Sequence, residues 1–166
     1  MTDDARFEDG APPALPGALT LLATDAEDLA VISALVQDAL LTPAQIRYDR
    51  GRRRLALLLN RFCWELRGDA PPAVPSRVRS LLVFGDVREV RAQGIRQHDP
   101  DAILSLLAIE YAPKADAAAT LTIRVAGDGA LRLEVDCIDA VLRDLSIPWP
   151  AACGRAPIHE GEGFNP

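Results

Sequence analysis

The sequence predicts an α+β fold: a bent antiparallel β-barrel or sandwich of about seven strands closed by a C-terminal helix, with an extra N-terminal strand and helix. Three observations lead to this prediction. Residues 120–125 and 131–136 alternate between apolar and polar side chains, as half-buried antiparallel strands do. Helical spacing of apolar residues occurs near residues 25–40 and 138–145, before and after the strands. The connections between the strands are too short for parallel crossovers.

The N-terminal elements are a short strand and a capped helix. Residues 19–22 are apolar and predict the strand. Thr24 and Glu27 have the spacing of a capping box, in which each side chain satisfies a free amide of the first helical turn. Pro43 ends the helix. The apolar face of the helix comprises Leu29, Ile32, Val36 and Ala39 or Leu40.

A hairpin follows the helix. Residues 45–48 and 54–59 predict two strands, and the turn at 49–52 contains Gly51, which can take the left-handed conformation that a bulged hairpin requires. The next strand-forming segment surrounds Gly85-Asp86, and this pair is as compatible with a β-bulge as with a tight turn. Residues 77–95 are therefore either one bent strand or a hairpin pair.

The C-terminal half predicts three strands and a helix. Residues 103–111 are largely apolar and predict a strand buried on both faces. The alternating segments on either side of Gly127-Asp128-Gly129 predict an antiparallel hairpin. Asp136 or Asp139 can then cap the terminal helix, which Pro148 ends. The apolar face of that helix comprises Ile138, Val141, Leu142 and Leu145.

Proline-rich segments near both ends of the chain flank a single predicted globular domain. Residues 1–18 predict a disordered acidic arm, residues 19–149 the domain, and residues 150–166 a loose tail. No uncharged apolar run approaches the roughly 18 residues that a membrane span needs. The N-terminus is acidic where a signal peptide is basic, so we expect no membrane span and a cytoplasmic protein.

Charge is distributed unevenly along the chain. Residues 1–43 hold eight acids and one base (−7), residues 44–98 twelve bases and five acids (+7), and residues 99–166 five bases and eleven acids (−6). Almost all of the positive charge is guanidinium, which binds carboxylates and phosphates in bidentate fashion. The predicted binding residues at the first hairpin are Arg47, Arg50, Arg52, Arg53 and Arg54. The alternative is that these arginines form a solvated turn, neutralised by the acidic flanks.

A second candidate locus follows the strand after this hairpin. Arg61 and Trp64 lie in the segment Asn60–Glu65, which joins an amide, a guanidinium and two large rings. One interpretation is a polar-rimmed groove in which Arg61 holds an anion and Trp64 forms the wall. The other is that the rings end a layer of the core while Arg61 pairs with an acid.

Little in the sequence indicates catalysis. There is no phosphate-binding glycine loop, and the histidines are only two, His98 and His159. The three cysteines have no metal-ligand spacing, so we expect no cofactor and no metal. A hydrolase that uses Cys137 and His98 is the enzymatic alternative, and it requires the two side chains to be adjacent in space.

The order of the predicted elements resembles the pleckstrin-homology-like superfold. In lipid-binding members of that superfold, the loop between the first two barrel strands carries basic residues that hold phosphates, and the arginine hairpin has the same position. Four blocks also resemble a bacterial family of small cytoplasmic proteins of unknown function, to which no activity is attached. The blocks are Asp25–Ala34, Leu59–Glu65, Asp101–Ile109 and Leu131–Ile138.

Together these observations predict a non-enzymatic binding or adaptor module. It would recognise an acidic protein segment or a small anion through the arginine hairpin. A homodimer through an exposed strand edge is possible. Nucleic acid is not expected, because Tyr48 is the only ring near the arginines and the pI is about 4.9. The alternative is a small enzyme with an unidentified cleft site.

Overall fold

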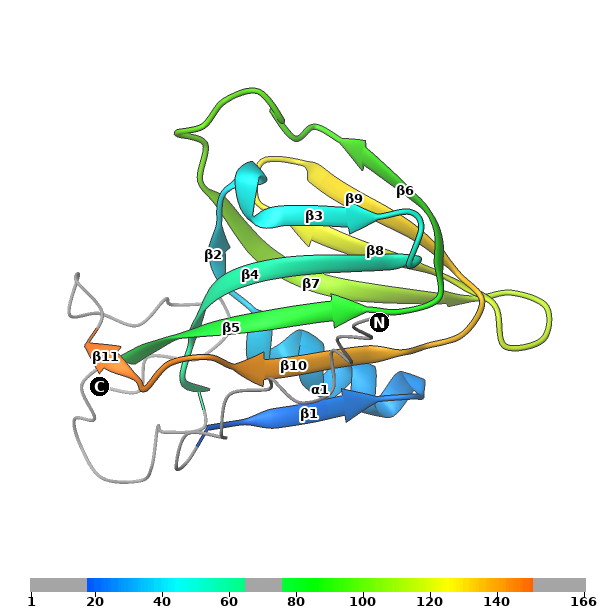
Figure 1. The fold of residues 1–166 in the computed structure, drawn as a ribbon, viewed down its shortest axis with the longest axis horizontal. Coiled ribbons are helices and arrows are strands. Elements are labelled where there is room, and N and C mark those ends of the chain that lie inside the picture. Colours follow the sequence, from blue (N-terminus) through cyan, green and yellow to red (C-terminus); the bar gives the residue numbers. More distant parts are fainter. Residues whose placement is uncertain (1–17, 65–75, 151–166) are drawn as a thin grey trace, which may run out of the picture.

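Over residues 18–64 and 76–150, the protein folds as one open, mostly antiparallel β-sheet with a single α-helix (Figure 1). The computed structural model describes residues 18–64 and 76–150, so residues 1–17 of the predicted arm and residues 151–166 of the predicted tail lie outside the described residues. In chain order the elements are β1 (Thr20–Ala23), α1 (Ala26–Val36), β2 (Leu40–Leu41), the 3₁₀ turn η1 (Pro43–Gln45), β3 (Ile46–Asp49), β4 (Arg54–Phe62), β5 (Ser76–Phe84), β6 (Val87–Gln93), β7 (Leu104–Pro113), β8 (Ala119–Val125), β9 (Gly129–Val135), β10 (Ala140–Asp144) and β11 (Trp149–Pro150).

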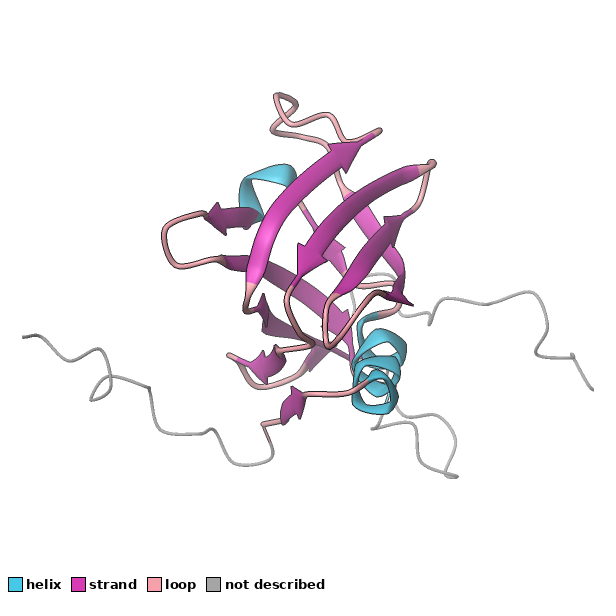
Figure 2. Ribbon diagram, turned by 90° about the vertical axis from the view of Figure 1, so that its right-hand side faces the viewer, coloured by secondary structure: helices cyan, strands magenta, loops and turns pink. Residues whose placement is uncertain are grey.

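The strands follow one path through the sheet. The order is β1-β10-β5-β4-β2-β7-β8-β9-β6, with β3 paired to β4 and β11 to β5. The short strand β2 joins the two halves, because Leu40 pairs with Asn60 of β4 and with Ser105 of β7. The strands curve strongly around the core, and α1 lies across one end of it (Figure 2).

The predicted fold class is wrong in three respects, the first of which is that the sheet has 11 strands within the described residues rather than about seven. The sheet is open, so it is neither a closed barrel nor a sandwich of two separate sheets. The predicted C-terminal helix is the strand β10, so the expectation of a pleckstrin-homology-like α+β fold closed by a C-terminal helix fails. The physical reason is that Ala140, Leu142 and Asp144 also satisfy a period of two, and β10 is paired along both edges, with β1 and with β5.

Residues 77–95 form neither one bent strand nor a hairpin. β5 pairs with β4 and β10, whereas β6 pairs with β9, so the two strands do not pair with each other. The chain turns between them at Gly85 and Asp86, where Asp86 has a φ of 52° and the Gly85 amide donates to the Asp139 carbonyl over 2.8 Å. This corner transfers the chain from one half of the sheet to the other.

The other predicted elements form with changed bounds: the N-terminal helix ends at Val36 rather than at Pro43, and Leu40, expected on its apolar face, belongs to the strand β2. The N-terminal helix is capped by Asp25 rather than Thr24, because an Asp25 carboxylate oxygen accepts from the Asp28 amide over 2.8 Å. Both predicted hairpins form, as β3–β4 and β8–β9. The strand predicted at 103–111 is β7, but its last residues are exposed rather than buried on both faces.

The core fills the space inside the curved sheet. Three α1 residues, Leu29, Ile32 and Val36, belong to the same buried cluster as inward side chains of both halves, such as Leu57 and Leu133. Inward and outward positions alternate along the long strands, as the pleat requires. The outward positions of β1, β10, β5, β4 and β3 therefore form one outer surface, which we call the basic face.

Candidate functional site

The arginine hairpin has a tightly specified turn. The Arg52 amide donates to an Asp49 carboxylate oxygen over 2.9 Å, and the Arg53 amide donates to the Arg50 carbonyl over 3.3 Å. Arg53 then adopts a φ of 55°, which reverses the chain into β4. The turn thus places Arg50 and Arg52 at the exposed tip and directs Arg53 elsewhere.

Arg53 is committed to an internal ion-pair network. Its guanidinium pairs with Asp136, and the other carboxylate oxygen of Asp136 lies 2.9 Å from Arg88 Nε. The hydrogen bond from Arg53 lowers the pKa of Asp136, although partial desolvation opposes the effect. Arg53 therefore joins the hairpin to the segment after β9, and of the five hairpin arginines it is the one least available to a ligand.

Arg61 is buried rather than poised at a groove. Its side chain is 0% exposed, and its Nε and Nη2 donate to the carboxylate of Asp144 over 2.9 and 2.8 Å. Trp64 is directed elsewhere: its Nε1 donates to the Gln37 carbonyl over 3.2 Å, and its ring centroid lies 5.1 Å from that of Phe62. This geometry matches the alternative in which Arg61 pairs with an acid.

Arg47 and Arg54 stand on the outward side of the sheet. Both are exposed, and both alternate with inward neighbours, Tyr48 and Leu55. Arg54 lies opposite Asp49 in the β3–β4 ladder. Within the described residues, no ion pair is formed by Arg47, Arg50 or Arg54. The predicted hairpin therefore contributes Arg47 and Arg54 to one face of the sheet, and Arg50 lies at the exposed tip of the turn.

The same face carries arginines that the sequence analysis did not single out. Arg79 of β5 and Arg143 of β10 occupy outward positions, and Arg79 is exposed. The alternation Val78-Arg79-Ser80 could have indicated an outward arginine. It could not have placed Arg79 beside β4, because the β4–β5 register joins segments separated by an intervening loop.

An apolar strip crosses the basic face between these arginines. One cross-strand row runs Leu22, Val141, Val83, Ala56 and Arg47, and the next runs Thr20, Arg143, Leu81 and Leu58. Leu22 is 59% exposed, whereas the other apolar residues of the two rows are partly exposed. The surface thus combines apolar contact area with guanidinium groups at its margins.

Carboxylates are scarce on this face. At the outward positions of β1, β10, β5, β4 and β3, the single acid is Asp49, and its oxygens are engaged by Arg52 of the same turn. The outer face of β6, β9 and β8 differs, because there Arg91, Arg132 and Arg124 are each paired with a glutamate. Uncompensated positive charge is therefore concentrated on the basic face.

The residues of the enzymatic alternative are far apart. Cys137 follows β9 just beyond the pair Val87–Val135, whereas His98 follows β6 beyond the other end of the same ladder, at Gln93–Ala130. Cys137 Sγ lies 3.2 Å from a carboxylate oxygen of Asp86, and this hydrogen bond and burial raise the pKa of the thiol. A raised pKa disfavours the thiolate nucleophile.

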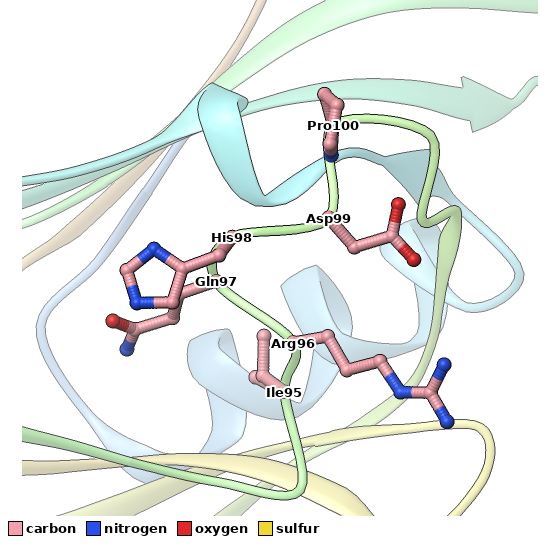
Figure 3. A pocket seen from close by; sticks show the side chains of 6 residues that line it. All are labelled: Ile95, Arg96, Gln97, His98, Asp99 and Pro100. Carbon is pink, nitrogen blue, oxygen red and sulfur yellow. The ribbon is translucent and has the colours of Figure 1, made fainter.

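A hollow of about 650 Å³ lies beside the loop that contains His98 (Figure 3). It is lined by six consecutive residues, Ile95 to Pro100. The His98 ring lies beside the Gln97 amide, while the Asp99 carboxylate points away from both, so no His–Asp pair forms. An Asp99 oxygen instead accepts from the Asp101 amide over 3.1 Å, as in a turn.

The described residues contain neither a group of metal-ligating side chains nor a membrane-spanning helix. In residues 18–64 and 76–150, no three acidic, histidine or cysteine side chains are grouped as metal ligands. Over the same ranges, α1 is too short to cross a bilayer, and the structure has no other α-helix there.

The fold and site define a mostly antiparallel β protein with one outer face on which Arg47, Arg54 and Arg79 form no ion pair within the described residues. The family described as "Protein of unknown function (DUF2948)" matches residues 19–159, and the chain belongs to that family. No curated protein and no solved structure matches it.

Proposed function

We propose that the protein is a non-enzymatic binding module that holds an acidic segment of a partner protein on the basic face. The observation that carries the proposal is the set of three exposed arginines, Arg47, Arg54 and Arg79, on one sheet face without an ion-pair partner among the described residues. The acidic flanks do not neutralise these three side chains within the described part of the chain.

The apolar strip favours a peptide over a small anion. A free phosphate would use the guanidinium groups alone, whereas Leu22, Leu58 and Leu81 offer contact area to apolar side chains beside the partner's carboxylates. A second copy of the protein is a poor occupant of this face, because it would bring the same arginines together.

Charge reversal on this face tests the proposal. The protein is titrated with a labelled peptide rich in glutamate and leucine, and binding is followed by fluorescence anisotropy. We expect the triple variant Arg47→Glu, Arg54→Glu and Arg79→Glu to bind about tenfold more weakly or worse, and the wild-type affinity to fall with added salt. Arg53 and Arg61 are left intact because both are needed for internal ion pairs.

The matched control reverses three cations on the other outer face. The variant Lys114→Glu, Arg124→Glu and Arg132→Glu has the same change in net charge and should bind the peptide as the wild type does. Equal loss in both triple variants would contradict the proposal, since it would show an effect of net charge alone. Tighter binding of a random-sequence DNA duplex or of inorganic phosphate than of the peptide would also contradict it.

A further inference from the structure

Within the described part of the chain, β1, β3, β6 and the two-residue strand β11 are each paired along one edge only. β3 pairs with β4 along one edge only, and β6, which ends the path of the sheet, pairs only with β9. Free edges expose backbone amides and carbonyls that can pair with another strand. The free edges of β3 and β6 can therefore each accept a further strand.

These edges lie on opposite sides of one pocket, which has a volume of about 390 Å³. Ile46 and Tyr48 of β3 line one side, and Val90 and Ala92 of β6 line the other. Leu55 and Leu131, both buried core residues, also line it. The pocket is thus a slot between two free edges, lined mainly by apolar side chains, and it reaches the core of the protein.

The slot is closed at one end. The Val87 amide donates to the Arg53 carbonyl over 2.9 Å, and the Tyr48 hydroxyl donates to the Val87 carbonyl over 3.0 Å. Paired strands lie only about 4.8 Å apart, whereas here a whole tyrosine side chain spans the distance between β3 and β6. At the other end the slot adjoins the loop after β6, since Ile95 and Gln97 line both this pocket and the hollow of Figure 3.

Positive charge borders the slot on both sides. Arg47 lies between the lining residues Ile46 and Tyr48, and Arg96 lies between the lining residues Ile95 and Gln97. Both arginines are exposed, and neither forms an ion pair within residues 18–64 and 76–150. Each border therefore presents apolar groups to the slot and a guanidinium beside it.

We propose that an extended segment of the partner, in which apolar residues alternate with aspartate or glutamate, adds as a strand between β3 and β6. Its backbone would bond to the free edges, its apolar side chains would enter the slot, and its carboxylates would face Arg47 and Arg96. The acidity of the segment rests on the proposed function, and Arg47 belongs to both surfaces. The strand addition itself rests on the two free edges and the slot.

The test separates backbone pairing from charge. The protein is titrated with a labelled peptide of alternating glutamate and leucine, and then with the same peptide N-methylated at alternate residues, in both frames. N-methylation keeps every side chain but removes amide donors. We expect affinity to fall about tenfold or more in at least one frame.

A slot-filling variant provides the second measurement. Ala92→Trp places a large ring in the slot and should lower affinity by a similar factor, whereas Ala112→Trp, at an exposed alanine of β7, should leave affinity unchanged. Circular dichroism confirms that both variants fold.

Each outcome decides one of the two proposals. Unchanged binding of both N-methylated peptides and of Ala92→Trp, with loss of binding in the arginine triple variant, would overturn strand addition and leave the proposed function standing. No peptide binding by the wild-type protein would overturn both. A wild-type dimer that Ala92→Trp converts to a monomer in sedimentation experiments would identify a second copy as the occupant and overturn the inference.

Discussion

Arg61 and Asp144 form a bidentate ion pair inside the protein although they are 83 residues apart in sequence. The pair is fully hydrogen-bonded: Ser80 Oγ and the Leu19 amide also donate to the Asp144 carboxylate, over 2.7 and 3.1 Å, and Arg61 Nη1 donates to the Phe62 carbonyl over 3.1 Å. It links β4, β5 and β10 to the start of β1. This polar cluster is buried within strands whose other inward side chains are mostly apolar.

Removing one partner of this pair should be costly. We expect Asp144→Ala to lower the free energy of unfolding by about 3–5 kcal/mol, because it leaves a buried guanidinium without its counter-charge. Urea denaturation measures the change. Glu89→Ala, which breaks the exposed pair with Arg91, should cost less than about 1 kcal/mol. Equal costs in the two variants would show that burial does not govern the contribution of the Arg61–Asp144 pair.

The same carboxylate should make stability depend on pH. Burial alone would raise the pKa of Asp144, but the hydrogen bonds from Arg61 and Ser80 and the charge of Arg61 outweigh it and lower the pKa. A carboxyl whose pKa is lower in the folded state stabilises the fold above its unfolded pKa of about 3.9. That stabilisation is lost as the pH falls through the folded pKa.

The variant Asp144→Asn isolates this effect. Its free energy of unfolding should fall furthest below that of the wild type near neutral pH, and the difference should shrink as the pH drops below about 4. Glu134, whose pKa is also lowered, titrates in both proteins and so cancels in the comparison. A difference that stays constant down to the acid transition would show that Asp144 titrates alike in the folded and unfolded states.

The helix cap gives a third prediction. The Asp25 carboxylate accepts from the Asp28 amide at the start of α1, so Asp25→Ala should lower the free energy of unfolding by about 0.5–2 kcal/mol. Asp25→Ser retains an acceptor and should lose much less. Thr24→Ala, at the residue that the sequence pattern suggested as the cap, should have little effect, and a larger loss there than at Asp25 would contradict the assignment of the cap.

Local patterns predicted the elements that local interactions determine. The helix α1 and the hairpins β3–β4 and β8–β9 follow from side-chain period, turn residues and caps within short stretches. Residues 138–145 are different, because their apolar residues fit both periods and the choice depends on pairing with β1 and β5, which come from distant parts of the chain. The closing helix of the predicted fold fails for that reason.

The candidate site shows the same division. Alternation with Tyr48 and Leu55 is a local signal that could have indicated that Arg47 and Arg54 face outward. Nothing local distinguishes Arg61, which shares the inward side of β4 with Leu57 and finds its acid on β10. The position of Arg79 beside β4 likewise depends on a long-range register.

Alanine substitutions at Gly94 and Gly127 measure how much a left-handed backbone conformation contributes to the free energy of unfolding. Both have positive φ, 65° and 82°, so an alanine at either position should cost about 1–2 kcal/mol of conformational energy. At Gly94 an added Cβ would also lie 3.1 Å from the Asp128 carbonyl oxygen and 3.2 Å from the Gly129 Cα, whereas at Gly127 it would meet nothing within 4 Å. We therefore expect Gly94→Ala to be the more destabilising of the two in urea denaturation. Equal losses would show that the turn between β8 and β9 yields to the new methyl group, and that left-handed backbone geometry accounts for the whole cost.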